Sequence, residues 1–217
     1  MLVHTLGGLG LSNSSFQRHK PLLLLSYLAI EGEQERYFIS KLFWPNAKHA
    51  RSSLSVALSQ IRKIDEKIIS SSDKSIKTRL KSDVGILQKR LIAKKYKKVV
   101  TNYWGSFVEN LNIDMGIELE EWVYKQREHI ALQVQDAYLH LAETEAKRQH
   151  FNKAAKLTKK ACQIKGLDCS ETKHQKRIYL LLRAANSSYI SKLEDCDFNI
   201  GFDEARAHFL SKKSKLL

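Results

Sequence analysis

The sequence predicts a mainly α-helical protein with a few short strands near its N-terminus. Only nine glycines and two prolines interrupt the 217 residues, which leaves few chain breakers for a strand-rich sandwich. Hydrophobic residues make up 43% of the chain, enough to fill a core, and over its second half they recur with the period of a helix. We therefore expect packed helices and not a disordered chain.

Composition also bounds the partners and the compartment. Lys and Arg number 37 against 23 Asp and Glu, a formal net charge of +14. The three cysteines are an odd number, which argues against a disulfide framework and for a reducing compartment. The longest apolar run, Leu22 to Leu25, is far too short to span a membrane, and the first residues lack the pattern of a signal peptide. We expect a cytoplasmic protein with no membrane partner.

The first elements are short and well marked. Residues 2–11 are apolar and interrupted by glycines, which is typical of one or two brief strands and a turn. Pro21 then opens a helix in which leucines recur, and Gly32 ends it. Ser40 is a candidate N-cap for a second helix over 41–44, which a proline ends.

A third helix is predicted over 47–64, with Asn46 as its cap. At about 100° per residue, its apolar side chains fall on one stripe centred on Leu54. The opposite side is small, basic and free of acids. It carries Lys48, Ser52, Ser55, Val56, Ser59 and Lys63, with Arg51 and Arg62 flanking the stripe.

The rest of the chain predicts a hairpin and then helices only. The hairpin has strands at 68–69 and 76–80 around a polar turn. The helices are predicted at 83–98, 118–149, 152–164 and 171–185. Two stretches, 91–99 and 145–154, place an aromatic residue three positions before a small or β-branched one, as helical repeats do at the bend between paired helices.

These elements indicate two domains, 1–82 and 83–217, the second ending in a less regular tail over 186–217. Three helices followed by a hairpin is the order of elements in a winged helix-turn-helix. The first 81 residues hold thirteen Lys and Arg against six acids, so +7 of the net charge lies in this segment. A segment with this positive charge favours nucleic acid as its partner, although a basic helix face can also be exposed to solvent without binding anything.

The exposed face of the third helix suits the major groove of double-stranded DNA. Side chains of modest size face base edges, and Lys and Arg neutralise phosphates. The candidates to face bases are Arg51, Ser52, Ser55, Val56 and Ser59. Lys48, Arg62 and Lys63 would hold the DNA backbone, and Lys74, Lys77 and Arg79 would form the wing on the hairpin.

Several segments together resemble a known family. Residues 6–11, 20–28, 42–47 and 50–63 are similar to the N-terminal winged helix of the bacterial antibiotic-regulatory-protein type of transcription activators. Residues 103–108 and 121–127 resemble the glycine-aromatic and tryptophan-arginine signatures of the bacterial transcriptional activator domain that follows it. The resemblance implies a DNA-binding head joined to a tetratricopeptide-like helical domain that recruits RNA polymerase.

The sequence offers no enzyme site and implies no cofactor. The eight histidines are scattered, there is no His-Glu-x-x-His or Cys-x-x-Cys motif, and no nucleotide-binding Gly-x-x-x-x-Gly-Lys loop occurs. We therefore expect no catalytic residues and no metal site. Trp104, Phe107 and Trp122 are interpreted as core packing. Six basic residues between Lys89 and Lys98 either extend the DNA footprint or keep a helix face solvated.

Two functions remain open at this point. The first is a sequence-specific DNA-binding transcription regulator, an activator that contacts RNA polymerase or associates with a second copy of itself. The alternative is a helical-repeat adaptor that binds proteins and has no sequence-specific DNA readout.

Overall fold

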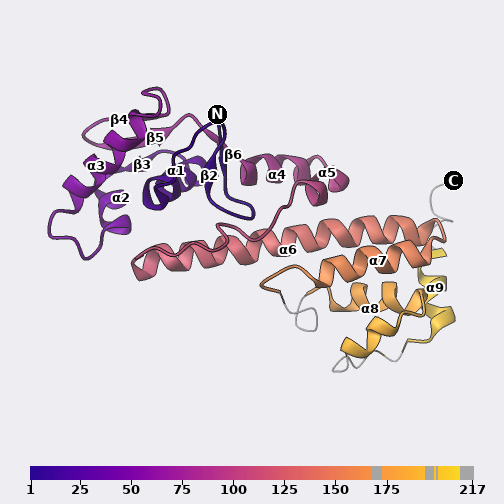
Figure 1. Ribbon diagram of the computed structural model, residues 1–217. Coiled ribbons are helices and arrows are strands. Elements are labelled where there is room, and N and C mark those ends of the chain that lie inside the picture. The colour runs from indigo at the N-terminus through magenta and orange to yellow at the C-terminus, as the bar shows by residue number, and fades with distance from the viewer. Residues whose placement is uncertain (168–172, 194–197, 199, 211–217) are drawn as a thin grey trace. The chain divides into compact units, whose positions relative to one another are not determined.

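The computed structural model describes residues 1–167, 173–193, 198 and 200–210. It is mainly helical, with two small three-stranded sheets in its N-terminal part and a helical region after them, as predicted (Figure 1). The chain divides into two compact units. Unit 1 holds Met1–Lys89 and Tyr103–Arg127, and unit 2 holds Arg90–Asn102 and Glu128–Leu217.

Unit 1 is built around a helix that is buried on all sides. Helix α1, His19–Glu31, has eight consecutive buried residues from Pro21 to Leu28, and it contacts α3, β1, β5 and β6. A helix that is apolar all round is stable only inside a core. Helices α2, Arg36–Phe43, and α3, Ala50–Arg62, pack against each other beside it.

The starts of α2 and α3 differ from the prediction. Ser40 is not a cap, because it lies inside α2, where its hydroxyl donates to the Tyr37 carbonyl at 2.7 Å. Asn46 is not a cap either. The amides of the first helical turn donate to the carbonyl of His49, so α3 begins at Ala50 and residues 48–49 form a turn. Tertiary packing of α2 on α3, and not the polar residues near their starts, fixes these boundaries.

Six short strands form the two sheets of unit 1. The first has the order β2-β1-β6, with β1 at Leu2–His4, β2 at Gly10–Leu11 and β6 at Lys81–Ser82. The second has the order β3-β5-β4, from Gln34–Glu35, Ser75–Thr78 and Ile69–Ser71. The predicted hairpin is confirmed as β4 and β5, paired antiparallel. Strand β3, which the sequence did not indicate, adds a third strand beside β5.

The segment Tyr103–Arg127 completes unit 1. The Gly7 amide donates to the Ser106 carbonyl at 3.0 Å, and Leu6 forms a bridge with Phe107. Gly7 has φ +83°, and a side chain there would press against the Trp104 backbone. Phe107 is buried and packs on Trp122, but Trp104 is 77% exposed, so its interpretation as a core residue is wrong.

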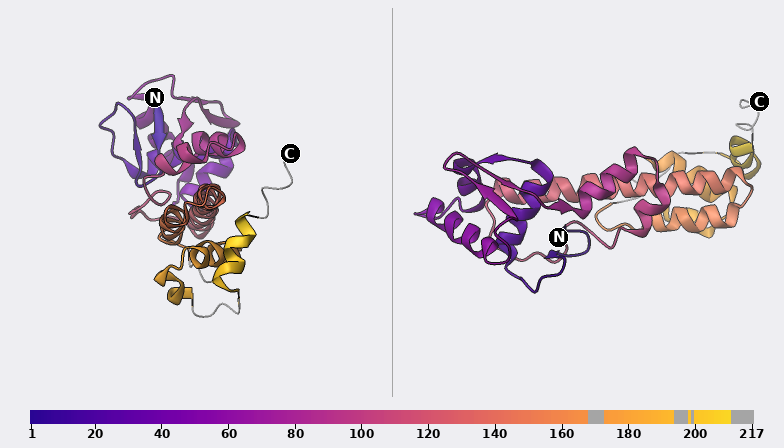
Figure 2. Two further views of the ribbon diagram at one scale, coloured as in Figure 1. Left: turned by 90° about the vertical axis from the view of Figure 1, so that its right-hand side faces the viewer. Right: turned by 90° about the horizontal axis from the view of Figure 1, so that it is seen from above.

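Every regular element that the structure describes after β6 is a helix. The expected helix over 83–98 is wrong, because two helices occupy it, α4 at Asp83–Ile92 and α5 at Tyr96–Thr101. The others are α6, Ile117–Lys147; α7, Phe151–Cys162; α8, Gln175–Ala184; a 3₁₀-helix, Ser188–Leu193; and α9, Phe202–Leu210. The start that we expected at residue 171 lies outside the described residues. Helix α8 lies between α7 and α9 and contacts both (Figure 2).

Three bends of unit 2 share one geometry. At Lys94, Gln149 and Asn186 the backbone is left-handed, with φ of 51°, 66° and 49°. The next residue's amide donates to the carbonyl five positions back, at 2.8 Å, 2.9 Å and 3.0 Å, which is the Schellman arrangement at a helix end. Glycine is the usual residue at such a position, and its absence explains why the sequence did not predict the break at Lys94.

We expect a glycine to stabilise such a bend. Gln149→Gly should raise the free energy of unfolding by about 0.5–1 kcal/mol, because it relieves a left-handed backbone that a side chain disfavours. Lys147→Gly, within the last turn of α6, should lower it by about the same amount. Urea denaturation followed by circular dichroism measures both changes. Equal losses in the two variants would contradict the left-handed bend.

Candidate nucleic-acid interface

Helix α3 has one buried and one exposed face. Leu54, Leu58 and Ile61 are at most 1% exposed, so the predicted apolar stripe is confirmed. All residues that the sequence placed at the DNA interface are exposed: Lys48, Arg51, Ser52, Ser55, Val56, Ser59, Arg62, Lys63, Lys74, Lys77 and Arg79. Val56, in the middle of this face, is 57% exposed. No acid occurs within α3, so its exposed face is uniformly small, polar or cationic.

Arg36 joins this face to the hairpin, and sequence reasoning missed it. Its guanidinium donates to the Ser55 hydroxyl at 2.9 Å and to the Ser72 carbonyl at 3.4 Å. The Ser55 hydroxyl in turn donates to the Arg51 carbonyl at 3.0 Å. Because Arg36 opens α2 and its partners lie 19 and 36 residues away, no local pattern could have identified it.

The hairpin β4–β5 contacts both α3 and the acidic residue Glu33. The Arg62 guanidinium donates to the Ser71 hydroxyl, which ties the end of α3 to β4. Lys77 lies 3.5 Å from the Glu33 carboxylate, which also accepts from the Ser75 hydroxyl. The Ser75 hydrogen bond, helped by the charge of Lys77, lowers the pKa of Glu33. Glu33 is a second residue that the sequence analysis did not single out.

Arg51 borders a small basic hollow. Its guanidinium lies 5.3 Å from the centre of the Tyr37 ring, a cation–π distance that holds it at the surface. The hollow encloses about 290 Å³. Its cationic and titratable lining residues are Lys41, Lys48, His49 and Arg51, and no acid lines it.

A second hollow lies on the other side of Val56. It measures about 440 Å³ and includes Arg18, Lys20 and Trp44 in its lining. The Lys20 ammonium lies 5.5 Å from the Trp44 ring centre and donates to the Asp114 carbonyl at 2.9 Å. Burial lowers the pKa of Lys20, against the opposing effect of the Asp114 carboxylate. Arg18 and Lys20 therefore add cations beside the predicted interface.

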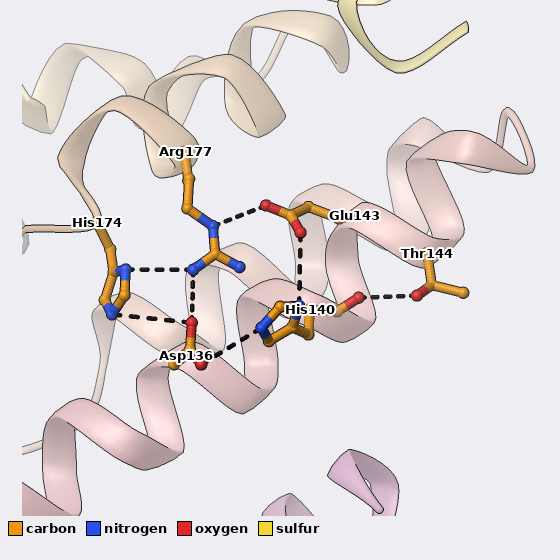
Figure 3. Close-up of polar contacts among 6 residues, drawn as sticks. All are labelled: Asp136, His140, Glu143, Thr144, His174 and Arg177. Atoms are coloured by element: carbon orange, nitrogen blue, oxygen red, sulfur yellow. Dashed lines mark hydrogen bonds and ion pairs between the residues drawn. The ribbon is translucent and has the colours of Figure 1, made fainter. Parts of the chain in front are cut away.

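The densest charged network of unit 2 is an ion-pair cluster between α6 and α8 (Figure 3). Arg177 lies 2.5 Å from Asp136 and 2.7 Å from Glu143, and its guanidinium also approaches His174 Nδ1 at 3.2 Å. His140 lies 3.4 Å from Asp136 and 3.7 Å from Glu143. Among the described residues no group of His, Cys, Asp and Glu has the geometry to hold a metal ion. The cluster therefore ties α8 to α6.

No known protein-family model matches the chain, and no curated protein is significantly similar to it. In the described part of the chain, no helix combines the length and the apolar character needed to cross a bilayer.

His174 should make unit 2 sensitive to acid. It is 6% exposed, and burial together with the charge of Arg177 lowers its pKa below the ordinary histidine value. The unfolded chain then binds the proton more readily than the folded chain, so the free energy of unfolding falls as the pH is lowered from about 7 to 5. In His174→Gln the fall should be smaller. Denaturation at a series of pH values measures it, and His129→Gln, at an exposed position of α6, is the control.

Proposed function

We propose that the protein is a sequence-specific DNA-binding transcription regulator, an activator whose unit 1 acts as a winged helix-turn-helix. The observation that carries the proposal is the exposed, acid-free face of α3, whose opposite face is anchored in the core. An α-helix fits the major groove of DNA, where short polar and apolar side chains can meet base edges. The antiparallel hairpin β4–β5 follows α3 and takes the place of the wing.

The contacts of this face suggest a role for each group. Arg51, Ser52 and Ser59, which are exposed, would face base edges, and Val56 would contact a thymine methyl group. Ser55 acts together with Arg36, because its hydroxyl already bonds that guanidinium. The guanidinium is the better base-reading group of the two, since it carries several donors in a fixed plane.

Phosphate contacts would come from both sides of α3. On one side lie Lys48 and Lys41 around the hollow of about 290 Å³. On the other lie Lys63 and the exposed hairpin residues Lys74 and Arg79. To bind phosphates, Arg62 would give up its hydrogen bond to Ser71, and Lys77 would give up its ion pair with Glu33. Such contacts set affinity and register and carry no sequence information.

The element order in unit 1 and the repeated bends in unit 2 support the resemblance to activators of the antibiotic-regulatory-protein type. On this proposal, unit 2 is a tetratricopeptide-like domain that contacts RNA polymerase or a second copy of the chain, in the cytoplasm. The three bends with one geometry also favour the alternative, a helical-repeat adaptor, because stacked repeats present extended surfaces to proteins.

Two binding experiments distinguish the regulator from the adaptor. Bound duplexes are first selected from a random pool, and fluorescence anisotropy then compares the affinities for the selected duplex and a random one at two salt concentrations. A regulator should prefer the selected duplex by a factor of about 10³ or more. An adaptor should bind both with equal, weak affinity. Equal binding of the two duplexes would therefore reject the regulator.

Two variants distinguish base reading from phosphate binding. Arg51→Ala should cost about 1–3 kcal/mol on the selected duplex and relax the preference at one position, because it removes a side chain that reads a base. Lys63→Ala should weaken all duplexes alike and reduce the salt slope by about one. Anisotropy titrations against single-position variants of the selected duplex measure both effects. If neither variant differs from the parent, α3 is not the reading helix.

A further inference from the structure

The bend between α4 and α5 carries a dense cluster of lysines. Lys94, Lys95, Lys97 and Lys98, which we call the bend lysines, occupy four of five consecutive positions, and all four side chains are exposed. The sequence has no Asp or Glu from 84 to 108, so no acid can reach them from a neighbouring turn of either helix. Their charges therefore repel one another without local compensation.

Several other cations of unit 2 are engaged within the chain. Lys153 lies 3.2 Å from Glu145, and Lys159 lies 5.6 Å from the centre of the Tyr189 ring. Arg177 pairs with Asp136 and Glu143, which both lie on α6. The bend lysines take part in no ion pair or cation–π contact within the described residues. They remain available to an external anion.

The backbone under the bend lysines is held firmly. Tyr96 stacks on His140 at 4.6 Å with the rings nearly parallel, and Val99 is fully buried. Arg90 reaches across the bend to the Lys98 carbonyl at 3.5 Å and to the Asn102 side chain. A charged surface on a fixed backbone loses less entropy on binding than one on a flexible tail.

Lys94 occupies a left-handed backbone position that favours other residue types. Its φ is +51°, and glycine or asparagine is the usual residue at this position of a helix end. A lysine there adds backbone strain to the repulsion among four neighbouring ammonium groups. The helix-end hydrogen bonds hold this left-handed backbone, as they do at Gln149, so the feature that sets this bend apart is the repulsion among its ammonium groups, which an anionic partner would relieve.

We propose that the bend lysines are a second DNA contact, which binds the phosphates of the duplex without reading its sequence. The proposal rests on the DNA-binding function of unit 1, because a contact from unit 2 then acts on a duplex that is already held. Lysine suits this role, since its ammonium is a point charge that binds phosphate without the planar fork that reads guanine. Linking two contacts through one chain raises the affinity of both.

The test is the salt dependence of DNA binding by the full chain. The variant carries glutamine at all four bend lysines, and a random-sequence duplex of about 30 base pairs is the probe. Neutralising one lysine that binds a phosphate lowers the salt slope by about 0.9, so we expect a fall of about 3.6 for the four together. The control replaces four other exposed lysines of unit 2 by glutamine, with the same change in net charge: Lys147, Lys156, Lys160 and Lys176.

The proposal is supported only if the bend variant and the control variant differ. For the random duplex, the salt slope of the bend variant should fall by more than that of the control variant. The bend variant should keep the parent's ratio of affinities for the selected and the random duplex. The salt slope of the control variant should fall by less than about one. Equal falls in both variants would reduce the effect to net charge and overturn the proposal. Unchanged binding in the bend variant would also overturn it.

Failure of the proposed function has a different signature. In that case the parent shows no preference between selected and random duplexes, whereas the slope of random binding still reports on the bend lysines. Lys94→Gly separates charge from structure, because it removes one cation and relieves the left-handed backbone. We expect it to lower the slope by about 0.9 without lowering the melting temperature. A lowered melting temperature with an unchanged slope would make Lys94 a structural residue and count against the proposal.

Discussion

The complete burial of α1 is the constraint on which unit 1 depends. From Pro21 to Leu28 every side chain is buried, so the helix cannot lie at the surface and neighbouring elements must cover it. The Ser26 hydroxyl donates to the Leu22 carbonyl at 2.9 Å, so this buried polar group is satisfied within the helix itself. Burying each of these leucines contributes roughly 1.5–3 kcal/mol. The apolar stripe of α3 is one of the covers, and for that reason its other face has to meet solvent.

A second constraint joins the N-terminus to the start of α4. The Asp83 carboxylate accepts from the amides of Thr5 and Leu6, at 2.8 Å and 2.9 Å, and from the Thr5 hydroxyl at 2.5 Å. Ser82, immediately before it, accepts from the Gly85 amide at 3.0 Å and caps the helix. One short stretch therefore ends the small sheet, begins a helix and holds the first strand. Near the same strand, Gly7 allows the chain to approach the Trp104 backbone closely.

The features that we predicted correctly depend on residues close together in the chain. The stripe through Leu54, Leu58 and Ile61 follows from helical periodicity alone, and the hairpin follows from its two apolar stretches around a polar turn. Arg36 and Glu33 were missed because their partners come from elements far along the chain. Trp104 was misplaced because the preference of large aromatics for cores gave way to backbone pairing beside it. The break at Lys94 was hidden because a lysine holds a position that glycine usually signals.

The internal contacts of the basic face affect how it could bind. Arg62 and Lys77 already have partners on the hairpin, so a phosphate must displace Ser71 from one and Glu33 from the other. The Lys77–Glu33 ion pair is exposed, and an exposed ion pair is worth about 0–1 kcal/mol, so exchanging it costs little. It does, however, release Glu33 close to a duplex, where a negative charge is unfavourable. The cations on the hairpin side of this face are therefore partly compensated within the fold, whereas Arg51 has no acidic partner among the described residues.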